Sequence, residues 1–367
     1  MVAAVNTERG IVIIDSGMSP TLSAKYRTII EKESGRSDFK YVINTHHHDD
    51  HINGNQVFKE AEIIAHQNAA KRMKEDYENN KAYLKQRRER NERMNQLTET
   101  LEKDSDQYKS IRAWVYPFQK MLDDYKTVFQ LILPSLTFTE NLTLDMDDLK
   151  IEVVYFGPGF HTDNDIIVSI PEENIVFTGD LLRRRDQYSD LESKSDFDPW
   201  ISSLDKILRR NNDVKNVVAY HEGVLPGAVL SDFHNSLINM RDDQRQKVSA
   251  VDSLRSMISA SGLQEAVNKF ESQFLNSRNK EYFIWEADLI SLAKEYQEKE
   301  KYDEAQIILK MCEKIFPNST TVLYRQGAFF MEAGKTKHAI EVYKKLLRIG
   351  PISIFLVDRI YQLENSK

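Results

Sequence analysis

The sequence predicts an α/β domain followed by an all-α region. Short apolar runs rich in β-branched and aromatic residues recur up to about residue 225, each bounded by turn residues. Helical patterns such as "LSAKYRTIIEKES" separate several of these runs. That alternation is typical of strands and helices packed in layers. From about Leu225 the strand signals stop and the rest of the chain has helical periodicity.

The runs that predict strands begin with the opening segment "VAAVNTERGIVIIDSG", which indicates two strands around a turn. The later runs are, in order, "YVI", "EIIA", "LTFTENLTL", "IEVVYF", "DIIVSI", "NIVFTG" and "NVVAY". Each is long enough for one strand of a layered sheet.

A helical insertion is expected at about residues 69–132. Residues 55–116 contain neither Gly nor Pro, and the first half of the insertion has only a thin apolar stripe on a polar helix. Its second half, "IRAWVYPFQKMLDDYKTVFQLILP", is far more apolar. We therefore expect the second half to pack on the domain and the first half to project.

A repeat of 34 residues, the tetratricopeptide period, appears near the C-terminus. The residues that match at this spacing are Ala293 with Gly327, Tyr296 with Phe330, Ala305 with Ala339, Ile308 with Val342, and Pro317 with Pro351. The alternative is a generic pair of helical hairpins. We predict a first domain at residues 1–225, a helical linker at 226–284, and a tetratricopeptide-like repeat region at 285–367 that ends in a capping helix.

Composition excludes several classes of protein. The net charge is -7 and both signs are well represented among the 29% charged residues, so no nucleic-acid partner is expected. No apolar run approaches the roughly 18 residues of a membrane span. The single cysteine, Cys312, excludes an internal disulfide. No signal peptide is evident, and the compartment stays open: cytoplasmic, or periplasmic or secreted if a leader has been removed.

The segment "NTHHHDDHINGN" places four histidines and two aspartates at His46 to His51. It follows the strand "KYVIN", and three other predicted strands also end in a residue that can bind metal: His161, Asp180 and His221. If these strands share a sheet and a direction, their loops converge at one edge. The pattern predicts a metal site there.

These motifs resemble those of the metallo-β-lactamase superfamily. Thr45 to His51 have the form T-H-x-H-x-D-H, and "GPGFHTDND", "VFTGD" and "VVAYHEG" are similar to the family's later metal motifs in the same order. "VIIDSG", with Asp15, resembles its early strand-turn motif. The resemblance covers about residues 1–225 apart from the insertion. It implies a four-layer αββα sandwich with the site at one edge.

The resemblance also implies a ligand set for two metal ions. Three histidines would bind the first ion, an aspartate and two histidines the second, and another aspartate would bridge them: His46, His48 and His161; Asp50, His51 and His221; and Asp180. Nitrogen and oxygen ligands without thiolate suit two zinc ions and also admit iron or manganese.

The implied activity is that of a metal-dependent hydrolase acting on a small molecule. A hydroxide bridging the two ions would attack an ester, lactone, amide or phospho/sulfo-ester bond, and Asp50 would take the released proton. Asp180 occupies the position where β-lactamases of this fold carry Cys or Ser, so antibiotic hydrolysis is not favoured. Tyr220 and Glu222 stand where many members have Gly beside the last histidine.

Two other functions stay open. One is a mononuclear iron oxygenase of the same fold, and the other is a repeat-based protein-binding module with a vestigial metal site. A diiron redox centre is not expected, because such relatives have Glu in place of His48. A protein partner or a homodimer through the helical regions is also expected, with Trp114 or Phe118 near the substrate entrance.

Several further residues have more than one interpretation. Thr162 and Asp165 either orient ligands or form an ordinary turn. His47 is expected to be an exposed loop residue. "RRRDQY", residues 183–188, either meets an anionic group or forms a solvated loop. His66, His234 and His338 are expected to be structural or exposed, although His66 is also a candidate for lining the pocket.

Overall fold

The described residues form two compact units. This computed structural model describes residues 1–182, 195–210, 213–276, 282–349 and 353–365. The division falls within helix α7 (Ala228–Gln246), after Leu237. The first unit holds both large sheets, and the second holds the helices beyond that point together with residues 195–197.

The first sheet has five strands in the order β1-β2-β3-β4-β5. They are β1 (Ala3–Thr7), β2 (Gly10–Ile14), β3 (Phe39–Ile43), β4 (Glu62–His66) and β5 (Leu136–Phe138). β1 and β2 form an antiparallel hairpin, and β2 to β5 run parallel. Helix α1 (Pro20–Ser34) connects β2 to β3; the Ser19 hydroxyl caps its start, and Gly35, in the left-handed region, ends it.

The second sheet has six strands in the order β11-β10-β9-β8-β7-β6. They are β6 (Asn141–Asp145), β7 (Lys150–Tyr155), β8 (Ile166–Ile170), β9 (Ile175–Gly179), β10 (Asn216–Ala219) and β11 (Gly223–Pro226). Neighbours pair antiparallel except β9 and β10, which are parallel. A short 3-10 turn, Pro171–Glu173, joins β8 to β9, and α6 (Asp198–Arg210) precedes β10.

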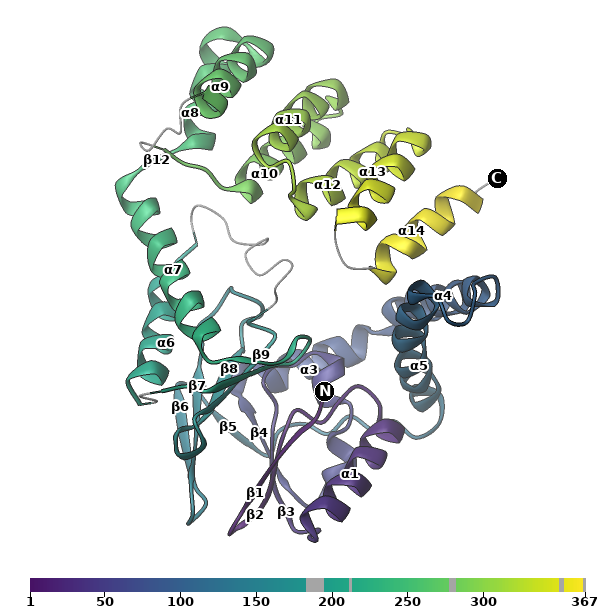
Figure 1. Cartoon of the computed structure of the whole chain (residues 1–367), viewed down its shortest axis with the longest axis vertical. Coiled ribbons are helices and arrows are strands. Elements are labelled where there is room, and N and C mark those ends of the chain that lie inside the picture. Colours follow the sequence, from purple (N-terminus) through teal and green to yellow (C-terminus); the bar gives the residue numbers. More distant parts are fainter. Residues whose placement is uncertain (183–194, 211–212, 277–281, 350–352, 366–367) are drawn as a thin grey trace. The chain divides into compact units, whose positions relative to one another are not determined.

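The two sheets pack face to face between outer helices. β2 is buried on both faces, which explains its unbroken apolar sequence. Ile14 joins Val168 in the core between the sheets, and Ile13 belongs to the cluster against α1. On the other outer face, Trp200 of α6 stacks on Phe156. The result is a four-layer αββα sandwich (Figure 1), as the sequence resemblance implies.

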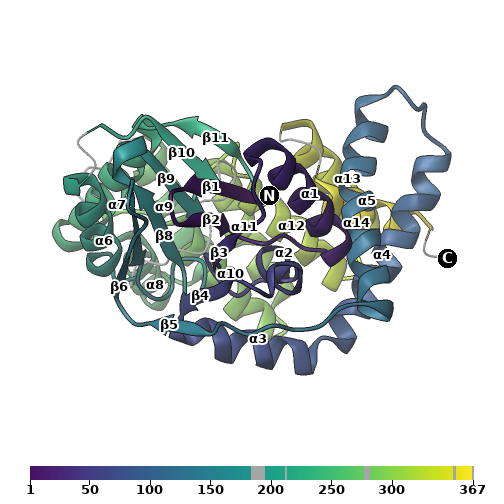
Figure 2. The same cartoon turned by 90° about the horizontal axis from the view of Figure 1, so that it is seen from below.

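The insertion consists of α3 (Gln67–Asn79), α4 (Lys81–Glu99) and α5 (Asp106–Thr127). α5 packs on α1 and on α4, and the chain then returns to β5 as an extended segment (Figure 2). The buried carboxylate of Asp124 joins α5 to the start of α1. It accepts hydrogen bonds from the hydroxyl of Ser19 (2.5 Å) and from the amide (3.0 Å) and hydroxyl (2.5 Å) of Thr21. The apolar half of the insertion is thus tied to the sandwich.

The second unit is almost entirely helical. Its helices are α8 (Ala250–Ser261), α9 (Leu263–Asn276), α10 (Glu286–Glu298), α11 (Tyr302–Ile315), α12 (Thr320–Glu332), α13 (Thr336–Ile349) and α14 (Ile354–Asn365). α10 pairs with α11, and α12 with α13. In the second pair a Cβ on Gly327 would lie 2.2 Å from the Tyr343 ring, so a small residue is needed there. The tetratricopeptide assignment, the domain boundaries and the protein partner or homodimer stay predictions.

The structure corrects one expectation for this region. Strands do occur beyond the point where the sequence indicates only helices: the two-residue strands β12 (Val248–Ser249) and β13 (Tyr282–Phe283) pair with each other. At that point itself, β11 closes a hairpin with β10. Such short strands are too brief to show a period of two. Among the described residues, no helix combines the length and apolar character that crossing a membrane requires.

Replacing Asp124 by Ala should lower the free energy of unfolding by about 2–4 kcal/mol, because three donors at the start of α1 would lose a buried charged acceptor. The measurement is urea unfolding of the full chain followed by tryptophan fluorescence. Asp123→Ala, at the neighbouring and less buried position, is the matched control and should change stability by about 0.5 kcal/mol or less. Equal effects of the two variants would contradict the anchoring role of Asp124.

Candidate metal centre

The four loops that carry the candidate ligands meet at one edge of the sandwich. Contrary to the simplest expectation, their strands do not share a sheet: β3 belongs to the first sheet, and β7, β9 and β10 belong to the second. The loops still converge, because β7, β9 and β10 run in one direction and the sheets are joined at this edge. The amide of Ile166 donates to the carbonyl oxygen of Thr45 across the two sheets (3.0 Å).

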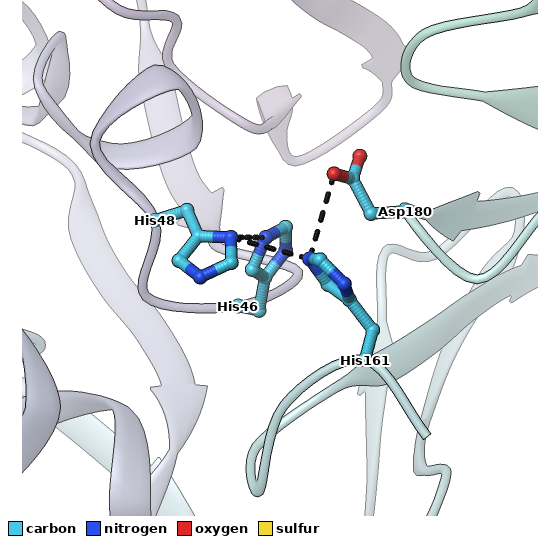
Figure 3. Close-up of side chains that lie close together, drawn as sticks. All are labelled: His46, His48, His161 and Asp180. Atoms are coloured by element: carbon cyan, nitrogen blue, oxygen red, sulfur yellow. Dashed lines mark hydrogen bonds and ion pairs between the residues drawn. The ribbon is translucent and has the colours of Figure 1, made fainter. Parts of the chain in front are cut away.

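Three histidine nitrogens point at one another in the first ligand group (Figure 3). His46 Nε2 lies 2.9 Å from His48 Nδ1, and His161 Nε2 lies 3.2 Å from the same atom. A carboxylate oxygen of Asp180 is 3.5 Å from His161 Nε2. Candidate ligand atoms of these four residues all lie within 4.8 Å of one another.

Asp50, His51 and His221 form the second ligand group, again with ligand atoms within 4.8 Å of one another. His51 and Asp50 belong to the short helix α2 (Asp49–Ile52), which follows the histidine run directly. Asp180 also faces this group, at 3.3 Å from His51 Nε2 and 3.2 Å from His221 Nε2. Its carboxylate therefore contacts both groups.

Gly179 explains how Asp180 comes so close to the histidine loop. It is the last residue of β9 and has a φ of 53°, in the left-handed region that favours glycine. A Cβ there would lie 2.7 Å from the Thr45 hydroxyl oxygen. Any larger residue would push β9 away from the loop that carries the histidines.

Asp15 and Thr45 determine which ring nitrogens face the site. The Asp15 carboxylate accepts from the amide and hydroxyl of Thr45 (both 2.8 Å) and faces His51 Nδ1 at 2.8 Å. Thr45 Oγ1 lies 3.3 Å from His46 Nδ1 and can accept a hydrogen bond from it. Both rings are thereby held with Nε2 toward the ligand groups. Fixing the tautomer in this way is what metal-binding histidines require.

Burial and charge set the protonation states of the ligands. Burial lowers the pKa of His46 well below its usual value and that of His48 to about 3, so both imidazoles are neutral at pH 7. For His51, burial is outweighed by the carboxylates of Asp15 and Asp50, which raise its pKa well above the usual value. Burial would raise the pKa of Asp180, but hydrogen bonds from His221 and His51 hold it low.

The donors of the first ligand group are spaced as a transition-metal ion requires. Zinc bound by nitrogen at roughly 2.0–2.1 Å in a tetrahedron needs ligand nitrogens about 3.3 Å apart. The separations of 2.9 and 3.2 Å between the ring nitrogens of His46, His48 and His161 are close to that value. The carboxylates supply the anionic oxygens that zinc, iron and manganese also accept.

The family model of the Metallo-beta-lactamase superfamily matches residues 2–221, which is more than half of the chain. The chain belongs to this superfamily.

Two relatives match part of this metallo-β-lactamase domain. "Metallo-beta-lactamase type 2" of Bacteroides fragilis is 32% identical over 119 residues, which are 32% of this chain and 47% of that protein. The protein of the same name from Bacillus cereus is 25% identical over 219 residues, 59% of this chain and 64% of that protein. The chain thus spans less than two thirds of the length of either relative. A solved metallo-beta-lactamase from Pontibacter korlensis is 19% identical with a TM-score of 0.40, over 65% of this chain and 86% of that chain.

The structure changes the interpretation of His47. Its side chain is only 11% exposed, so the expectation of an exposed loop residue is wrong. The buried amide of Asn164 holds it: Oδ1 accepts from the His47 backbone amide (3.0 Å), and Nδ2 lies 2.9 Å from His47 Nδ1. His47 belongs to neither ligand group. Asn164 is a residue that the sequence analysis missed, although it lies three positions after His161 in the second metal motif.

Thr162 and Asp165 brace the loop that carries His161. Asp165 is buried, and its carboxylate accepts from the backbone amide of Thr162 at 2.6 Å. Burial raises the pKa of Asp165 to about 6. The contact closes a turn directly after His161, as the ordinary-turn interpretation expects, and the orienting role stays a prediction.

Tyr220, where many family members have Gly, covers one ring of the second ligand group. Its ring lies 3.7 Å from that of His51, measured between centroids. Its hydroxyl donates to the carbonyl oxygen of Asp50, on the other side of the same loop. The substitution therefore adds a packing contact to α2 that a glycine could not supply.

The remaining histidines lie outside the site. The His66 side chain accepts a hydrogen bond from the amide of Asn68 at the start of α3, and its ring stacks on Tyr155 with centroids 4.0 Å apart. His66 therefore has a structural role. His234 of α7 faces Asp205 of α6, and His338 packs beside Phe330. The basic segment at residues 183–188 lies outside the described residues.

Asp15→Asn should weaken metal binding about tenfold to a hundredfold. Asparagine tolerates the φ of 56° at this position, but its amide presents a donor to His51 Nδ1. The proton then moves to Nε2, the atom that faces the second ligand group. Competition with a chelator measures the affinity, and Asp38→Asn, at an exposed site, is the control. Unchanged affinity in Asp15→Asn would show that His51 does not depend on this carboxylate.

Acid should destabilise the metal-free protein through His48. Its pKa is about 3 in the folded state and about 6.5 in the unfolded state. Between these two values the unfolded state binds a proton at His48 and the folded state does not. Stability falls as pH falls, by about 2 kcal/mol at pH 5 for this residue. His48→Gln should therefore lose less melting temperature between pH 7 and pH 5 than the unmodified chain. Parallel losses in both proteins would contradict the buried neutral state of His48.

Proposed function

We propose that the chain is a hydrolase that uses two metal ions, with zinc the best match to the ligands. The observation that carries the proposal is the position of Asp180. Its carboxylate lies 3.5 Å from a nitrogen of the first ligand group (His161) and 3.2–3.3 Å from nitrogens of the second (His221 and His51). A carboxylate that faces two complete groups is what a bridging ligand requires.

The proposed reaction is attack by water on an ester, lactone, amide or phospho/sulfo-ester bond. The ions would supply Lewis acidity and a water that ionises near neutral pH. Asp50, whose carboxylate is 19% exposed and lies 3.4 Å from His221 Nε2, is placed to accept a proton. His221 is 46% exposed and lies on the open side of the site.

No thiol nucleophile of this chain competes with that role. Cys312, the only cysteine, is buried in α11 of the second unit, where burial raises the pKa of its thiol to about 12. A thiol in that state is a packing residue. The nucleophile is therefore assigned to water.

The ligand set favours this reading over the two alternatives. A mononuclear iron oxygenase needs only the first group, whereas Asp50, His51 and His221 form a second group of comparable compactness. The contacts of Asp15 and Thr45 orient the His46 and His51 rings for metal binding, and a vestigial site does not require such contacts. Both features support a working dinuclear centre.

Elemental analysis of zinc-loaded protein should find close to two ions per chain, and Asp180→Asn should reduce that number and abolish hydrolysis. The hydrolysis assay is a panel of ester, lactone, phosphodiester and sulfate substrates. Asp163→Asn is the matched control, because Asp163 pairs with Arg72 near the site and belongs to neither ligand group. One tightly bound ion, or full activity in Asp180→Asn, would overturn the dinuclear proposal.

A further inference from the structure

A pocket of ≈ 330 Å³ opens beside the metal centre, between the histidine loop and the insertion. His48, a candidate metal ligand, forms part of its wall together with Asp49 and Asn53 of the adjoining α2 segment. His47 and Ile52 of the same loop also line it, and the rest of the wall comes from α3, the start of α4, the end of α5 and the segment after it. The helical insertion therefore supplies most of a cavity that borders the ligands.

The insertion gives the pocket an aromatic wall. Tyr125 and Phe129 pack with ring centroids 4.3 Å apart, and Tyr77 lies 5.9 Å from Phe129. Tyr83, from the first turn of α4, lines the pocket as well. Rings from three separate parts of the insertion thus converge on one cavity. Burial of a ligand against such rings is favourable and depends on its shape.

The acidic groups of the wall are Asp76 and Asp49, and burial together with the neighbouring Asp50 raises the pKa of Asp49. Asp49 accepts a hydrogen bond from the Tyr83 hydroxyl (2.7 Å), and Asp76 faces His47 Nε2 at 3.3 Å. Among the described residues that line the pocket there is neither Lys nor Arg. Arg87 does not line the pocket, but its guanidinium lies 4.6 Å from the Tyr83 ring centroid. Aromatic faces and carboxylates attract cations, accept neutral groups and repel anions.

We propose that this pocket binds the non-reacting part of the substrate, and that this part is an aromatic or branched aliphatic group that is neutral or cationic. The inference rests on the proposed hydrolase function, because His48 both lines the pocket and belongs to the first ligand group. A volume near the lower end of the roughly 300–1,000 Å³ of ligand pockets suits a group of one substituted ring. Tyr77, Tyr83, Tyr125 and Phe129 are the specificity-determining residues.

Trp114 and Phe118 are the residues expected near the substrate entrance. They stack on each other at 4.2 Å on α5, and Arg87 lies 4.7 Å from the Phe118 ring centroid. Neither residue lines the pocket. Phe118 is connected to Tyr83 through Arg87, and the position of both rings near the substrate entrance stays a prediction.

Binding of three small probes to the full chain tests the charge preference. The probes are benzyltrimethylammonium, benzyl alcohol and phenylmethanesulfonate, measured by ligand-observed NMR titration with and without zinc, since bound metal by itself attracts the anion. In the metal-free chain we expect the cationic and neutral probes to bind at least about fivefold more tightly than the anionic probe. Equal or tighter binding of the anionic probe overturns the proposal.

Variants locate the binding. Phe129→Ala and Tyr77→Ala should each weaken the favoured probe about threefold to tenfold. Asn79→Lys, which adds a positive charge at the pocket wall, should shift the preference toward the anionic probe. Tyr77 is 44% exposed, so its truncation keeps the fold even if Phe129→Ala does not. Tyr116→Ala, on α5 but outside the pocket and 43% exposed, is the control and should bind normally.

The two proposals fail in different ways. If Phe129→Ala and Tyr77→Ala both bind the probes normally while two zinc ions and hydrolysis persist, the pocket proposal is overturned and the hydrolase stands. If the probes follow the expected order and the variants weaken them but the chain neither holds two ions nor hydrolyses the panel, the pocket's charge preference stands. In that case its assignment to a hydrolase substrate falls with the proposed function.

Discussion

The metal centre depends on one buried carboxylate. Asp15 ends the β2 segment in a left-handed conformation, is 2% exposed, and binds the amide and hydroxyl of Thr45 and the ring of His51. The histidine loop is thus attached to the neighbouring strand at the point where its ligands begin. In a buried site, three hydrogen bonds to one carboxylate are strong, and no neutral side chain replaces them fully. The orientation of the His46 and His51 rings follows from these contacts.

The site exists because two sheets end at the same edge. Neither sheet carries a complete set of ligands: the histidine run belongs to the first, and His161, Asp180 and His221 belong to the second. Backbone and side-chain hydrogen bonds join the two halves, from Ile166 to Thr45 and from His47 to Asn164. Packing of the sandwich core therefore sets the spacing of the candidate ligands. A substitution in the core is expected to change that spacing even when the substituted residue contacts no ligand.

The end of α5 both anchors the helical insertion to the sandwich and borders the candidate metal centre. Asp124 fixes α5 to the start of α1, where the helix N-terminus favours a negative charge. The last residues of α5 and the segment after it then place Tyr125 and Phe129 beside the histidine loop. A polar helix such as α4, with few buried residues, gains little from burial alone. Its packing on α5 gives it a place in the wall of the pocket through Tyr83.

The sequence by itself determined the α/β class and predicted the candidate ligand set. The reason is local: His46, His48, Asp50 and His51 are spaced within one loop, and His161, Asp180 and His221 each follow an apolar strand. Only the tertiary structure decided which sheet holds β3, why His47 is buried, what Tyr220 covers, and that Asp124 joins two helices. Those contacts connect residues more than a hundred positions apart, such as His47 with Asn164 and Asp50 with Tyr220. Periodicity reports a residue's own strand or helix, whereas its distant neighbours are chosen by the packing of the whole core.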